Sequence, residues 1–224
     1  MQSVYIAIGF VGLAAQLLVI YALISSDPRR FGGLLFYLLV LFLTTVADLA
    51  VFLGVGAWPD WYREYYYLNN TLRHLSGFVA LVSLVHLATV AAPDRVITRF
   101  KIVAGSVLVI AMSLLLASGQ WPDQYMNTAS RNLSFATVIL NIVLWLALVK
   151  NRATDRRLFL VSGGLGLNMA GEAIGQSLLG ISPAVETLGN LVGIGSHFLC
   201  LYVWWSAFRL RDGRTAADDR LMTL

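Results

Sequence analysis

Seven stretches of this chain are long and apolar enough to cross a lipid bilayer as helices, and this feature restricts the fold most strongly. Crossing roughly 30 Å of hydrocarbon takes about 20 predominantly apolar residues. Inside hydrocarbon the backbone must satisfy its own hydrogen bonds, which favours helices. The chain is 58% hydrophobic and 12% charged, whereas soluble domains carry about 25% charged residues. The stretches cover approximately residues 4–25, 31–57, 68–91, 101–118, 129–149, 157–180 and 187–208.

We therefore predict an all-α fold, an integral membrane seven-helix bundle. A single domain is expected over residues 1–210, followed by a short basic and polar tail over residues 211–224. All five prolines lie between the apolar stretches, so the helices are predicted to be unbroken. The first stretch has no basic segment before it and no small-residue cleavage site after it, and we expect it to be retained as a helix.

The basic residues predict the orientation of the bundle. Lys and Arg in short loops stay on the cytoplasmic side of a membrane. Only Arg63, Arg73 and Arg131 fall on the side of the N-terminus, and the other thirteen of the 16 Lys and Arg residues fall on the opposite side. We predict an outside N-terminus and a cytoplasmic C-terminus, in a bacterial inner membrane. The net charge of +4 then reflects arginines near anionic lipid, and no nucleic-acid partner is expected.

Polar residues within the predicted helices are the candidates for function. Ionisable groups in hydrocarbon are costly, so each one is a functional hypothesis. Asp48 and Glu172 are the only acids within the spans. Glu172 shares one helix face with Asn168 and Gln176 because the three are spaced four residues apart. The other candidates are Arg73, His74, Arg131, Asn132, Asn190 and His197.

These polar residues allow two interpretations. In the first, they bound an outward-opening polar cavity among the second, third, fifth, sixth and seventh helices, which binds a small ligand or an ion. In the second, they bond to one another as interhelical hydrogen bonds, each worth under about 1 kcal/mol on average. The residue pattern is consistent with both.

The sixth and seventh stretches are rich in glycine. Gly171 and Gly175 in one, and Gly189 and Gly193 in the other, match the GxxxG spacing that allows helix backbones to approach closely. We predict that these two helices pack tightly together. The alternative is that the same motif drives dimerisation, but the short loop between the helices favours the intramolecular contact.

Three cofactor chemistries are tested by residue type and position. Retinal needs a lysine inside the bundle, and the only two lysines lie at predicted helix ends, which excludes it. Haem needs two histidines at one depth, but His74, His197 and His86 are predicted at three different depths. Asp48, His74 and His197 are the remaining zinc candidates, without the usual ligand spacing. We therefore predict no cofactor and no metal.

Three local features resemble a known group of proteins. They are an aromatic segment leading into the third helix, an arginine at the start of the fifth, and a basic start to a glycine-rich sixth helix that carries Glu172. Their residues are Tyr65, Tyr66 and Tyr67; Ser130, Arg131 and Asn132; and Arg156 and Arg157. The arrangement resembles a group of bacterial seven-helix membrane proteins with no established activity. The resemblance implies the architecture and no catalytic residues.

A seven-helix bundle with short loops and an outward polar cavity is typical of receptor-like proteins. We predict a small-ligand-binding or sensory protein, more readily than an enzyme. No kinase or cyclase domain is recognisable in these residues, so we expect a membrane or cytoplasmic protein partner. The alternatives are a membrane-embedded enzyme that uses a metal or acid and base groups, a transporter, and an accessory subunit. Internal repeats or interrupted helices, typical of transporters, are not evident.

Overall fold

The computed structural model describes residues 2–55, 62–89, 135–146, 148–149, 155–178 and 182–209, with a few helical residues between 100 and 115. All regular structure in these ranges is helical, as predicted. The candidates Arg131 and Asn132, most of the predicted span 101–118 and the tail 211–224 lie outside the described residues. The helices are α1 (Gln2–Ser26), α2 (Gly32–Val55), α3 (Tyr62–Ala88), α6 (Arg156–Leu178), α7 (Pro183–Arg209) and the shorter Phe135–Leu146.

Five of these helices, α1, α2, α3, α6 and α7, are long and apolar enough to cross a membrane. Only 28% of the apolar segment of α1 is buried inside the protein, whereas 56% of the apolar segment of α6 is buried. Large side chains therefore point away from the bundle, such as Tyr21 at 73% exposed and Leu43 at 63%. Exposing such surfaces to water costs about 25 cal/mol per Å², whereas lipid accommodates them. The five helices are those of a multi-pass membrane protein.

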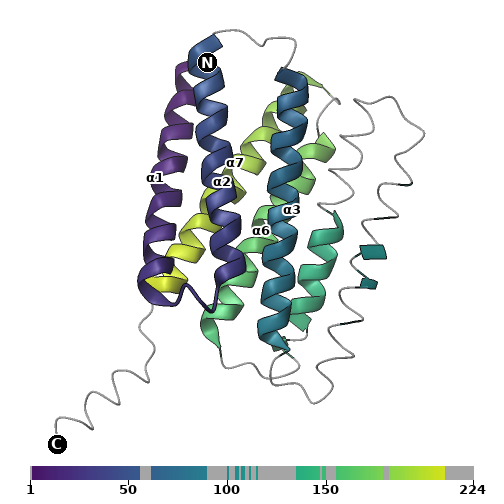
Figure 1. The fold of residues 1–224 in the computed structure, drawn as a ribbon. Coiled ribbons are helices and arrows are strands. Elements are labelled where there is room, and N and C mark those ends of the chain that lie inside the picture. The colour runs from purple at the N-terminus through teal and green to yellow at the C-terminus, as the bar shows by residue number, and fades with distance from the viewer. Residues whose placement is uncertain are drawn as a thin grey trace, which may run out of the picture.

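The labelled helices form a closed ring. In Figure 1, α1, α2 and α3 stand side by side while α6 and α7 cross behind them. The packed pairs are α1 with α2, α2 with α3, α3 with α6, α6 with α7, and α7 with α1. We call the end of the bundle that holds Gln2, Val55 and Tyr62 the N-terminal end. The opposite end, which holds Ser26, Ala88 and Arg209, is the tail end.

The helix α3 extends beyond the apolar stretch predicted from the sequence. The helix begins at Tyr62 and not near Leu68, because no proline or glycine interrupts the chain between Tyr62 and Ser76. At 1.5 Å per residue, Arg73 therefore lies about 16 Å along the helix instead of near its end. This longer helix places Arg73 at the level of polar groups on α2.

Glycine allows α6 and α7 to pack most closely. A Cβ atom on Gly175 would lie 2.9 Å from the carbonyl oxygen of Gly189, and one on Gly189 would lie 2.9 Å from that of Gly175. Gly171 is similarly covered by the Ser196 side chain. Gly193 is different, because a Cβ there would meet no described atom within 4 Å. At three of the four predicted packing glycines, a Cβ atom would therefore be too close to the neighbouring helix.

Aromatic packing fixes the tail half of the same contact. The Trp204 indole is 1% exposed, and its N–H donates to the carbonyl oxygen of Val161 at 2.9 Å. Its ring meets Tyr37 edge to face at 6.0 Å between centroids. A Cβ atom on Gly164 would lie 2.6 Å from the Trp204 indole nitrogen, so glycine at that position makes room for the ring.

Candidate functional site

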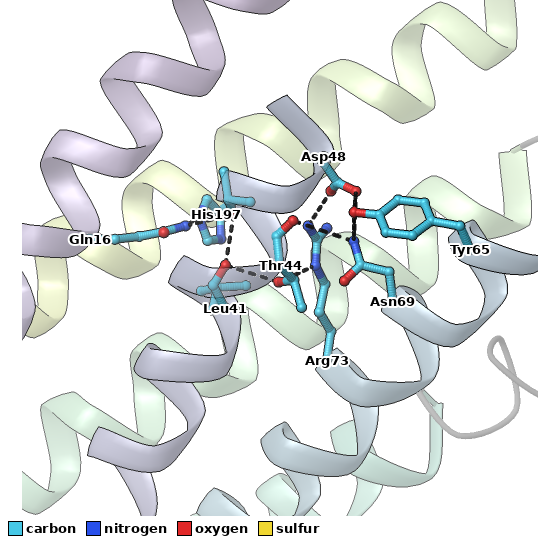
Figure 2. A network of polar contacts seen from close by, with 9 residues as sticks. Gln16, Leu41, Thr44, Asp48, Tyr65, Asn69, Arg73 and His197 are labelled. Atoms are coloured by element: carbon cyan, nitrogen blue, oxygen red, sulfur yellow. Dashed lines mark hydrogen bonds and ion pairs between the residues drawn. The ribbon is translucent and has the colours of Figure 1, made fainter. Parts of the chain in front are cut away.

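An ion pair between α2 and α3 forms the centre of the first polar cluster. Nη2 of Arg73 donates to Oδ2 of Asp48, and Nε of Arg73 donates to Oγ1 of Thr44 at 2.9 Å (Figure 2). The other carboxylate oxygen accepts from the Asn69 amide at 2.6 Å and from the Tyr65 hydroxyl at 3.0 Å. The acid of α2 is therefore in contact with three donor side chains of α3, of which Arg73 carries the charge.

The residue spacing explains why these side chains meet. Tyr65, Asn69 and Arg73 are four residues apart and share one face of α3, while Thr44 and Asp48 share one face of α2. Asp48 and Arg73 were predicted from the sequence, whereas the three residues that hold them were not. The four-residue spacing on both helices was the signal that identifies them.

The ion pair lies at membrane depth yet is partly open. Asp48 is seven residues from the end of α2, or about 10 Å. A charged residue at the centre of a membrane helix costs about 2.5–3.5 kcal/mol when the helix is inserted into a membrane. A charge at this depth therefore needs a partner. The side chains of Arg73 and Asp48 nevertheless remain 28% and 36% exposed. The pair is thus satisfied within the bundle and still reachable from outside it.

A second charged contact joins α3 to α6. The carbonyl oxygen of Asn70 accepts from Nδ1 of His74 at 2.8 Å, which places a hydrogen on Nδ1. Nε2 of His74 then faces Oε2 of Glu172 at 3.7 Å. His74 is almost fully buried, whereas the Glu172 side chain is 30% exposed.

The charges of these groups all influence the pKa of one nearby tyrosine, Tyr66. Tyr66 precedes the apolar part of α3, and 47% of its surface is exposed. Desolvation by the surrounding protein raises the pKa of its phenol, the positive charge of Arg73 opposes that rise, and the carboxylates of Glu172 and Asp48 add to it. Both acids and the arginine therefore act on one region near the N-terminal end.

An uncharged network lies deeper in the bundle. Nδ1 of His197 lies 3.2 Å from Oδ1 of Asn168, and Nε2 of His197 lies 3.4 Å from the amide nitrogen of Gln16. Asn168 also donates to the Tyr37 hydroxyl at 3.3 Å. One neutral tautomer, with the hydrogen on Nδ1, satisfies both contacts of His197. The network links α1, α2, α6 and α7.

The two sets of polar groups meet at one backbone carbonyl. Gln16 donates to the Thr45 hydroxyl at 3.3 Å. Thr45 and Thr44 both donate to the carbonyl oxygen of Leu41, at 2.8 and 2.9 Å (Figure 2). A carbonyl oxygen accepts hydrogen bonds and donates none. The junction at Leu41 therefore connects the two clusters through hydrogen bonds, but it does not pass a proton between them.

The remaining candidates lie apart from these contacts. Asn190 is exposed on α7, and Gln176 on α6 keeps its side-chain oxygen without a partner among the described residues. The zinc candidates Asp48, His74 and His197 each belong to a different set of contacts. In the part of the chain that the structure describes, no three His, Cys, Asp or Glu side chains gather as a metal site.

Gln16, which bridges α1 to α7, was also not predicted from the sequence. It is the only amide side chain in the first apolar stretch, 4–25, and is 1% exposed. A buried amide in an otherwise apolar helix must find a hydrogen-bond partner, and this isolation was the available signal.

Two grooves lie along the contact of α1 with α7. The first has a volume of about 390 Å³ and an apolar lining that includes Val4, Ile8 and Phe198. The second, of similar volume, lies near the tail end beside Tyr21 and Arg209. Neither groove is lined by Asp48, Arg73, His74 or Glu172.

Comparisons of this chain with protein-family models, with curated proteins and with solved structures return no significant match. The fold and the site accordingly define its class: a multi-pass α-helical membrane protein with an ion-pair cluster inside its helix bundle.

Proposed function

We propose that this protein is a seven-helix, receptor-like membrane protein that binds a small polar ligand at the charged cluster of Asp48, Arg73, His74 and Glu172. We further propose an outside N-terminus, a cytoplasmic C-terminus and a location in a bacterial inner membrane.

The direction of the helices supports seven crossings. Trp145 donates to Ser162 at 3.1 Å and Asn141 packs against Gly166, so the Phe135–Leu146 helix runs antiparallel to α6 and toward the tail end. The helix α3 also ends at the tail end. Two described helices that both run toward the tail end support the proposal of a further crossing between them, for which the predicted span 101–118 is the candidate.

The described charges support the proposed orientation. Among the described residues, the tail end carries five arginines and two aspartates, whereas the arginines in the other half are Arg63 and Arg73. An excess of arginine marks the cytoplasmic side of a membrane protein. The residues at the tail end are Arg29, Arg30, Arg156, Arg157 and Arg209, with Asp27 and Asp155.

The observation that carries the ligand proposal is partial exposure of three charged side chains within apolar helices. Arg73, Asp48 and Glu172 are 28%, 36% and 30% exposed, whereas His197 and Asn168 form a deeper uncharged network. Groups with only a structural role in hydrocarbon gain by complete burial against one another. Groups that exchange a partner with a ligand need this access.

The charges indicate the chemistry of the ligand. A guanidinium has five N–H donors, and Arg73 uses two of them on Thr44 and Asp48. The cluster also contains two acids for one arginine. A small zwitterion would satisfy both features, with its carboxylate on Arg73 and its ammonium group on Glu172.

The cluster is coupled to the rest of the bundle. A ligand carboxylate that displaces Asp48 from Arg73 also perturbs the bond from Arg73 to Thr44. Thr44 shares the Leu41 carbonyl with Thr45, which bonds to Gln16 and so to the network at His197. Binding near the N-terminal end is thereby linked to the contacts of α1 with α7.

The experiment is a thermal-unfolding screen of the purified protein in lipid nanodiscs against single amino acids, primary amines and carboxylates. A ligand at 100 times its Kd stabilises a protein by about 2.7 kcal/mol. We expect an amino acid to stabilise the unmodified protein, and Asp48→Asn and Glu172→Gln to abolish that stabilisation. Glu186→Gln, which changes an acid on α7 outside the cluster, is the matched control and should keep it.

The proposal is wrong if no compound stabilises the unmodified protein while both cluster variants unfold at lower temperature. That outcome would assign the cluster to stability alone. Equal ligand stabilisation of the cluster variants and of Glu186→Gln would place the binding site elsewhere.

A further inference from the structure

The groove at the tail end combines an apolar wall with a cation. Its volume is about 390 Å³, and its lining includes Leu18, Tyr21 and Ser25 of α1. Trp205 and Arg209 of α7 form the opposite wall. Leu18 and Tyr21 are 57% and 73% exposed, so the apolar wall faces the surroundings of the bundle.

Arg209 lies at the mouth of this groove with its charge available. Its guanidinium carbon lies 4.5 Å from the centre of the Trp205 ring, a cation–π contact that positions the side chain. Among the described residues, no carboxylate pairs with it, in contrast to Arg30, whose guanidinium contacts Asp155. Arg209 is exposed and keeps its N–H donors for a partner.

The groove runs from the helix ends into the apolar part of the bundle. From Ser26 to Leu18 it extends about 12 Å along α1, at 1.5 Å per residue. The hydroxyls of Ser25 and Ser26 are near the charged end, and the apolar side chains follow toward the bilayer interior. This order of polar and apolar groups matches that of a phospholipid, with its headgroup at the interface and its acyl chain in hydrocarbon.

We infer that this groove is a binding site for one anionic phospholipid, whose phosphate contacts Arg209 and whose acyl chain lies along Leu18, Tyr21 and Ala22. Among the described residues of the surrounding tail end, five arginines outnumber two aspartates, and this positive charge attracts an anionic headgroup. The site is separate from the charged cluster and does not depend on the ligand proposed there.

The test uses native mass spectrometry of the full chain, purified in detergent and supplied with phosphatidylglycerol or with phosphatidylcholine of the same acyl chains. We expect one phosphatidylglycerol molecule to be retained in preference to phosphatidylcholine. Arg209→Gln should weaken retention about fivefold, the effect of one basic residue near an anionic headgroup. Ser25→Trp, which fills the groove without changing any charge, should also weaken it.

Arg156→Gln is the matched control, because Arg156 is an exposed arginine at the same end and does not line the groove. Equal losses in Arg209→Gln and Arg156→Gln would show general charge attraction and overturn the proposal. Equal retention of both lipids, or competition by free glycerol phosphate, would overturn it too. Loss of a dimer in Ser25→Trp with unchanged lipid retention would assign the groove to a second copy of the chain.

Discussion

Two glycines of a single GxxxG motif are predicted to respond in opposite directions to alanine. A Cβ atom on Gly189 would lie 2.9 Å from the carbonyl oxygen of Gly175 and 3.1 Å from Cβ of Leu178. Ordinary contacts between carbon and a carbonyl oxygen are about 3.3–3.6 Å. The oxygen belongs to the backbone of α6, so relief requires the two helices to move apart.

Two opposing contributions determine how much Gly189→Ala changes the stability of the protein. Overpacking a well-packed site costs about 1–3 kcal/mol, and alanine in a helix returns about 0.5–1 kcal/mol relative to glycine. Gly189→Ala should therefore destabilise the protein by about 1–2 kcal/mol. Gly193→Ala meets no described atom within 4 Å, so only the helix contribution remains and the variant should be neutral or more stable.

The assay is thermal unfolding of both variants in one detergent, with the molar mass of each measured by light scattering. A difference of about 2 kcal/mol corresponds to roughly 4–8 °C in Tm for a chain of this size. Equal destabilisation by both alanines would refute the close approach of α7 to α6 at Gly189. A loss of dimer in Gly193→Ala alone would instead support dimerisation through the motif.

Two other substitutions test the contacts that hold the ring together. Arg73→Gln leaves the Asp48 side chain without its cation, and Asp48→Asn leaves the Arg73 guanidinium without its anion, so each single variant should destabilise the protein. A double-mutant cycle measures the free energy of unfolding of both single variants and of the double variant. The double variant should lose at least about 0.5 kcal/mol less than the sum of the two single losses. If the losses simply add, the ion pair contributes nothing to stability. Trp204→Phe removes the hydrogen bond to Val161, whose carbonyl oxygen keeps its partner within α6, and this loss should cost about 0.5–1.5 kcal/mol. Trp205→Phe, at a partly exposed position, is its control, and a loss as large as that of Trp204→Phe would contradict the assignment.

The sequence by itself determined the class of fold and where the helices run. Apolar length alone predicts the five described spans, because a backbone in hydrocarbon has few alternatives to the helix. The same reasoning selected Asp48 and Glu172, since a charge within an apolar stretch stands out without knowledge of its neighbours. The helix α3 begins at Tyr62, before the predicted apolar stretch from Leu68, because hydropathy marks where a helix becomes apolar and not where it begins.

Only the tertiary structure decided which side chains meet. Lipid and bundle core are both apolar, so a membrane helix carries no strong amphipathic stripe that shows which face turns inward. Gln16 could not be assigned to His197, nor Arg73 to Asp48, without the rotation of each helix. For the same reason Gly189 and Gly193 look equivalent in the motif, yet only a Cβ atom on Gly189 would meet α6 within 4 Å. Those pairings depend on how the helices turn and cross, which close packing within the ring determines.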